Sequence, residues 1–152
     1  MNQTKLSPAN IVILAAGVVM LIGSFLDFYK LSLHGFGGSY SASAWSGANG
    51  FGVFGIATVV VLCGVAMAAQ VGLSTFASGV SLPDTPLGLS WDQVHLALGF
   101  QATLMMLAFL IRSKSSLSFG IGFWLMLLSA IALLVGAIMR VAGAGATPNA
   151  AG

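Results

Sequence analysis

Long apolar runs, separated by short stretches that hold nearly all of the charged residues, dominate the chain. The runs cover residues 9–26, 51–71, 94–111 and 119–139. As helices they would be about 27 Å to slightly over 30 Å long, which matches the roughly 30 Å hydrocarbon core of a bilayer. None of them alternates between polar and apolar residues as a barrel strand does. The pattern therefore predicts an all-α membrane protein with one domain, residues 1–152, that forms an antiparallel bundle of four transmembrane helices.

The composition agrees with this prediction. Hydrophobic residues make up 58% of the 152 residues and charged residues only 5%, whereas about 25% of the residues of an ordinary soluble domain are charged. A soluble fold of this composition would lack the polar surface that water requires. The net charge of +2 is too small and too scattered to indicate nucleic acid binding. We expect neither a cofactor nor a metal, because no motif for either is present and the second histidine, His34, lies across the membrane from His95.

Capping residues mark where two of the helices begin. Ser7 precedes Pro8, which fits the first position of a helix because its missing N–H is not needed there. Ser90 and Gln93 have the spacing of a capping box directly before the third apolar run. Both patterns are explained by helix formation and require no function.

The segments outside the apolar runs predict little regular structure. Residues 31–50 are rich in glycine, serine and aromatic residues, which favours an irregular loop. Tyr40 and Trp45 in this loop either anchor it at the membrane interface or form an exposed recognition surface. Residues 141–152 are small and polar, and we expect them to form a disordered tail.

Polar residues of the third helix are the strongest candidates for chemistry. Asp92 lies in the first turn and His95 follows three residues later, so both side chains can meet on one face of the helix. This pair could hold a proton at the membrane boundary, although a structural hydrogen bond at a helix end explains it as well. Gln101 would lie near the bilayer centre, at the depth that Ser129 reaches on the fourth helix. A hydrogen bond between Gln101 and Ser129 would set the register of the two helices.

Small residues at helical spacing predict close contacts between helices. Gly64 and Ala68 form a small-xxx-small pair in the second helix, and Ser129, Ala132 and Gly136 line a groove along the fourth. These surfaces are sufficient to build the bundle. The pattern does not distinguish a neighbouring helix of the same chain from a helix of a second chain.

Positive charges beside the first helix predict the orientation of the chain. Lys5 and the amino group lie on one side of this helix, whereas Lys30 on the other side is offset by Asp27. Because the more positive flank usually stays in the cytoplasm, we expect both termini there.

Several segments resemble a known group of membrane proteins. They read "GSFLDFYKLS", "SAWSG", "LPDTPLGLSWDQVHLALG" and "GIGFWLMLLSAIALLVGAIMR". In these segments the chain is similar, over most of its length, to the small four-span membrane proteins common in actinobacterial genomes. The resemblance implies a four-span topology and a plasma-membrane location, and none of its features is a catalytic motif. The chain departs from the pattern at Asp27, where such proteins often have proline, so the end of the first helix can differ in shape.

These observations favour a non-enzymatic membrane protein that acts by association, as an accessory subunit of a membrane complex or as a homo-oligomer. The alternative is a small transporter or proton-coupled carrier that uses Asp92, His95 and Gln101 in a polar cavity. An enzyme acting on lipid is disfavoured, because no nucleophile and base occur together. A lipid bound between the helices is compatible with the pattern.

Overall fold

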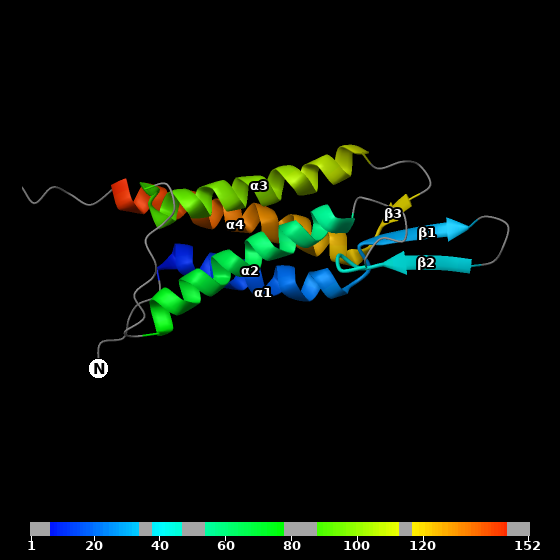
Figure 1. Ribbon diagram of the computed structural model, residues 1–152, viewed down its shortest axis with the longest axis horizontal. Helices are drawn as coiled ribbons and strands as arrows, with labels where there is room; N and C mark the ends of the chain where they lie inside the picture. Colours follow the sequence, from blue (N-terminus) through cyan, green and yellow to red (C-terminus); the bar gives the residue numbers. More distant parts are fainter. Residues whose placement is uncertain (1–6, 34–37, 47–53, 78–87, 113–116, 146–152) are drawn as a thin grey trace, which may run out of the picture.

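The computed structural model describes residues 7–33, 38–46, 54–77, 88–112 and 117–145. Within these residues the chain is mostly helical, with four long helices packed together (Figure 1). They are α1 (Pro8–Phe25), α2 (Phe54–Phe76), α3 (Trp91–Arg112) and α4 (Ile121–Gly145). Each helix is long and apolar enough to cross a membrane, which indicates a multi-pass membrane protein.

The helices lie where the apolar runs predicted them, although their ends differ. α3 begins at Trp91, before residue 94, and α2 continues past residue 71 to Phe76. α4 continues to Gly145, so residues 141–145, which we expected in a disordered tail, are helical. Alanine, the strongest helix former, occupies two of these five positions. Residues 51–53 of the second predicted span and residues 146–152 of the predicted tail lie outside the described residues.

The expected caps explain where α1 and α3 begin. Ser7 Oγ accepts a hydrogen bond from the Asn10 N–H at 3.3 Å, with Pro8 at the start of α1. The Gln93 N–H donates to Ser90 Oγ at 3.3 Å, and the Ser90 N–H donates to Gln93 Oε1 at 2.9 Å. This reciprocal pair is the predicted capping box, and it starts α3 before the apolar run does.

A small antiparallel sheet lies at one end of the bundle. β1 (Tyr29–Leu33) pairs with β2 (Gly38–Ala42) and with β3 (Leu117–Phe119), in the order β2-β1-β3. The all-α prediction and the irregular loop expected over residues 31–50 are therefore wrong for these strands. Tyr29 lies opposite Phe119, which is far along the chain. This long-range pairing leaves no local signal, whereas the pairing of β1 with β2 is a local hairpin within residues 29–42.

Aromatic side chains join the sheet to the helices. Phe28, directly before β1, is fully buried, and its ring lies 5.3 Å edge-on from the rings of Phe109 on α3 and Phe123 on α4. The ring of Phe119 in β3 stacks on that of Phe123. Buried aromatic rings contribute large apolar areas, so this group holds the sheet against the bundle.

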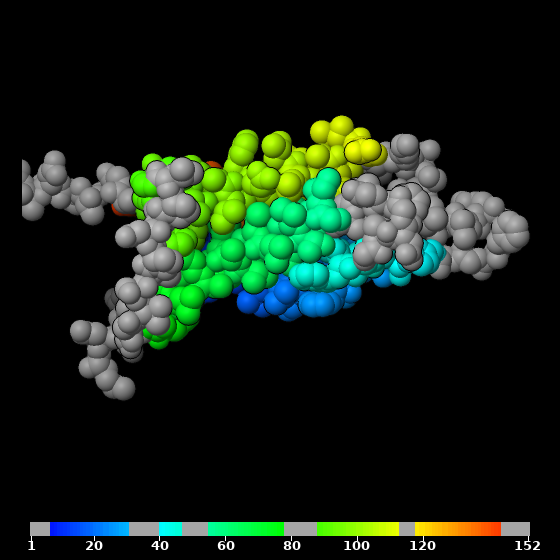
Figure 2. Space-filling model, in the orientation of Figure 1, coloured from blue at the N-terminus to red at the C-terminus, as the bar shows by residue number. Residues whose placement is uncertain are grey.

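The end of the bundle away from the sheet gathers the start of α1, the start of α3 and the end of α4 (Figure 1). α1 contacts α2 and α4, and α3 packs against α4 and α2. Figure 2 shows α2 and α3 side by side on one face of the molecule. The candidate functional site lies at the end that the sheet does not cover.

Candidate functional site

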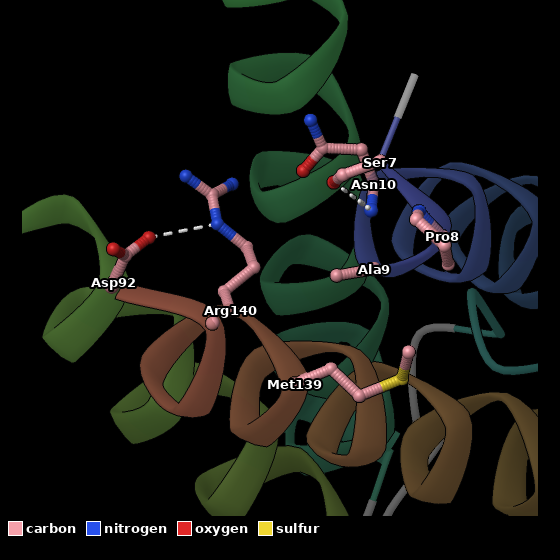
Figure 3. A pocket seen from close by; sticks show the side chains of 8 residues that line it. Ser7, Pro8, Ala9, Asn10, Asp92, Met139 and Arg140 are labelled. Carbon is pink, nitrogen blue, oxygen red and sulfur yellow. Dashed lines mark hydrogen bonds and ion pairs between the residues drawn. The ribbon is translucent and has the colours of Figure 1, made fainter. Parts of the chain in front are cut away.

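Three helix ends border an open pocket of about 470 Å³ (Figure 3). The first turn of α1 forms one wall, the first turn of α3 the second, and the end of α4 the third. The lining residues are Ser7, Pro8, Ala9, Asn10, Asp92, Met139, Arg140 and Gly143. The α1 side is mixed, with Ser7 and Asn10 polar and Pro8 and Ala9 apolar, and a charged pair lies on the side between α3 and α4.

The charged pair consists of Asp92 and Arg140. The capping box places Asp92 in the first turn of α3, where the helix dipole also favours a carboxylate. Arg140 Nε donates to Asp92 Oδ1 at 2.7 Å, with 19% of the arginine and 29% of the aspartate side chain exposed. A hydrogen bond between two charged groups at this length is strong for its type. It therefore ties the start of α3 to the last turns of α4.

His95 lies beside the same guanidinium and is 1% exposed. Its Nδ1 is 3.3 Å from Arg140 Nη1. A guanidinium carries only donors, so Nδ1 accepts this hydrogen bond and the imidazole carries its proton on Nε2. Nε2 has no hydrogen-bond partner among the described residues. The site thus contains a buried donor next to an ion pair.

The sequence predicted a direct contact of Asp92 with His95, and the structure replaces it with a shared contact to Arg140. No hydrogen bond joins Asp92 to His95 in the described part of the chain. Sequence reasoning missed Arg140 because it lies on another helix, far along the chain. One signal was present: Arg140 directly follows the last predicted span, at the membrane boundary on which Asp92 also lies.

The cluster has the chemistry of an interhelical clamp. It offers one carboxylate, one imidazole and one guanidinium, and the described residues contain no group of three or more metal-ligating side chains. His34 lies outside the described residues. The imidazole is the one group in the cluster that exchanges a proton near neutral pH in its ordinary state.

The predicted hydrogen bond between Gln101 and Ser129 is wrong. Gln101 is exposed on the outer side of α3, where its Nε2 lies 4.0 Å from Met105 Sδ. Ser129 is buried, and its Oγ has no partner among the described residues. The contact with α4 comes instead from Thr103, whose hydroxyl lies 3.0 Å from the carbonyl oxygen of Ala130. Two residues along a helix are about 200° of rotation, so Gln101 and Thr103 face different sides.

The small residues named from the sequence lie at contacts within the chain. A Cβ atom added at Gly17 of α1 would collide with Ala68 Cβ and lie 3.0 Å from the carbonyl oxygen of Gly64 on α2. A Cβ added at Gly136 would lie 2.7 Å from Ile13 Cγ1 on α1. Ala132 packs, partly buried, against the core of the bundle. The groove along α4 is therefore filled by the chain's own α1.

The two aromatic residues of the first loop differ in their surroundings. Trp45 Nε1 donates to Ser24 Oγ at 2.7 Å, and its ring stacks on that of Phe25 at 5.8 Å. Trp45 therefore fixes the segment after β2 to the end of α1. Tyr40 on β2 is 59% exposed. Of the two, Tyr40 presents the larger open surface.

A comparison of the sequence with protein-family models and with curated proteins finds no match.

Proposed function

We propose that this chain is a non-enzymatic integral membrane protein of the plasma membrane that acts by associating with other membrane protein chains. In this proposal the four helices form an antiparallel bundle, and the partner is either a second copy or the larger subunit of a complex. The observation that carries the proposal is the exposed amide of Gln101. It lies in the middle of α3, about 15 Å from either end at about 1.5 Å per residue.

An exposed amide at this depth faces hydrocarbon when the chain is alone. Burying an amide without hydrogen bonds costs roughly 2–7 kcal/mol, depending on the reference state. The Met105 thioether, 4.0 Å from the Gln101 nitrogen, is only a weak acceptor. Polar side chains in membranes recover part of such a cost by bonding to a neighbouring helix, for roughly 0.6–2 kcal/mol each. Association through the outer face of α3 relieves this cost.

The test is crosslinking in native membranes at natural expression level, followed by purification in mild detergent and mass spectrometry. Wild type should carry a stoichiometric partner or a second copy. Gln101→Leu should lose it while keeping its helical circular dichroism, whereas Phe100→Leu, at an exposed position one residue away, should keep the partner. An isolated wild-type monomer would contradict the proposal.

A second candidate is a proton-coupled carrier, and His95 is the residue that favours it. Its imidazole is buried, with Nε2 without a partner among the described residues and the Asp92–Arg140 pair beside it. This candidate requires a pH-dependent flux in proteoliposomes that His95→Gln abolishes. A flux that survives the substitution removes His95 from the mechanism, and no flux in wild type removes the candidate.

A further inference from the structure

We infer that α3 docks on α3 of a second copy of this chain, with the two Gln101 amides hydrogen-bonded to each other across a twofold axis along the membrane normal. This inference rests on the proposed function, because it names the partner for the same surface. Four observations support it: the depth of Gln101, the chemistry of its amide, the apolar character of the other exposed helix faces, and the residues that flank Gln101 on α3.

The depth of Gln101 and the direction of α3 are the same in both copies, because the two chains have the same sequence. Two copies of one chain insert with the same orientation, so both Gln101 side chains lie at the middle of the membrane. A primary amide carries both donors and an acceptor. In a symmetric pair, each Nε2–H donates to the Oε1 of the other copy, which gives two reciprocal hydrogen bonds. This satisfies the rule that a residue on a twofold axis meets itself.

The other helices offer no equivalent partner. Among the described residues, the exposed side chains in the middle of α1, α2 and α4 are all apolar. A second copy that docked through any of these faces would place apolar side chains against Gln101. The exposed apolar side chains of these faces include Val18, Val19, Ile22, Val59, Leu62, Leu128, Ile131 and Val135. For a partner of the same sequence, the polar side chain that matches Gln101 is Gln101 itself.

The residues around Gln101 form a seam suited to a second helix. Ala97, Gln101, Leu104, Ala108 and Ile111 are all exposed and are spaced alternately four and three residues apart, which is the spacing of a coiled-coil contact. Ala97 and Ala108, which flank Gln101 and Leu104 along this row, let two helix backbones approach closely. We call these five residues the α3 seam.

The α3 seam lies opposite the face that α3 uses inside the chain. The buried residues of α3 are His95, Gly99, Ala102, Met106 and Phe109, and on a helical projection their centre is about 160° from the centre of the seam. α3 also has the smallest share of buried residues among the four spans, 33% against 50% for α4. Figure 2 shows α3 along an outer edge of the molecule for most of its length.

The experiment is cysteine crosslinking of the full chain in native membranes. Cys63, the native cysteine, is replaced by Ala. Single cysteines are then placed on the α3 seam (Ala97→Cys, Leu104→Cys, Ala108→Cys) and at exposed α3 positions outside it (Leu107→Cys, Leu110→Cys). After mild oxidation, the seam variants should form disulfide-linked dimers and the two control variants should not.

A second measurement isolates the amide. Gln101→Leu in the Leu104→Cys background removes both reciprocal hydrogen bonds and should lower the dimer association constant by roughly 10- to 1,000-fold, which corresponds to two hydrogen bonds of the usual strength between membrane helices. Gln101→Asn keeps the amide on a shorter side chain and should lose less. Equal dimer formation by the Leu104→Cys chain and by its Gln101→Leu and Gln101→Asn variants would overturn the inference.

The remaining outcomes separate the inference from the proposed function. Dimers trapped by a general crosslinker, with no disulfides along the α3 seam, overturn the α3 contact and leave association standing. Gln101-dependent capture of a different membrane protein by a chain that does not dimerise overturns the second copy as partner and also leaves association standing. A wild-type chain without any partner overturns both.

Discussion

The guanidinium of Arg140 contacts two side chains of α3, the carboxylate of Asp92 and the imidazole of His95. Replacing it by leucine leaves the carboxylate without its cation and the imidazole without its donor. We expect Arg140→Leu to lower the free energy of unfolding by about 1–3 kcal/mol, the usual cost of a lost hydrogen bond between charged groups. The measurement is denaturation in detergent micelles followed by circular dichroism.

A double-mutant cycle separates this pair from other effects of the substitution. Asp92→Asn removes the charge of the partner with little change of shape. If the pair is the main contribution, Arg140→Leu with Asp92→Asn should cost at least about 0.5 kcal/mol less than the sum of the single variants. Strict additivity would show that Arg140 acts through contacts other than Asp92.

The side of α3 on which each polar residue lies could not be predicted from the sequence. In a soluble protein the polar side of a helix faces water, so the pattern identifies the buried face. In a membrane, lipid is as apolar as the core, and this signal is lost. The depth of Gln101 followed from simple counting along α3. Its rotation did not, so the expected bond to Ser129 is replaced by the contact of Thr103 with Ala130.

At the scale of helices, close contact between α1 and α2 depends on Gly17. A Cβ atom there would collide with Ala68 of α2, whereas a Cβ atom at Gly143 on α4 has nothing within 4 Å. We expect Gly17→Ala to destabilise the fold by about 1–3 kcal/mol, because an extra carbon in a packed contact forces the helices apart. The same substitution at Gly143 should be neutral or stabilising by up to about 1 kcal/mol. Thermal denaturation of both variants in one detergent compares them, and equal midpoints would contradict the packing argument.

Helices and strands of this chain differ in how well their sequences predict them. Each helix forms its backbone hydrogen bonds locally, so an apolar run of sufficient length and a capping box such as Ser90 and Gln93 predict it. β1 pairs with β3 through residues as distant as Tyr29 and Phe119. No window of sequence contains both partners. The pairing of β1 with β3, and the contact of Arg140 with α3, could therefore be found only from the fold, whereas the β1–β2 pairing lies within residues 29–42.

For the whole molecule, the two ends of the bundle differ in character. One end has the sheet, with Tyr40 and Ser118 exposed, and the other has the Asp92–Arg140 pair, with Ser7 and Gly143 exposed. If the four helices each cross the membrane, these two ends must lie on opposite sides. Residues far apart in the sequence, such as Ser7 and Gly143, would then share a side, as would Tyr40 and Ser118.

Single cysteines at these four positions, in a chain with Cys63→Ala, test the arrangement. A membrane-impermeant maleimide should label Tyr40→Cys and Ser118→Cys in intact cells, and Ser7→Cys and Gly143→Cys only after permeabilisation. The positive Lys5 just before α1 leads us to expect this direction. Labelling of the opposite pair would invert the orientation and keep the four spans. Labelling of one member from each pair would mean that at least one helix lies along the membrane surface. If that helix is α3, its seam loses the depth at which two Gln101 amides meet.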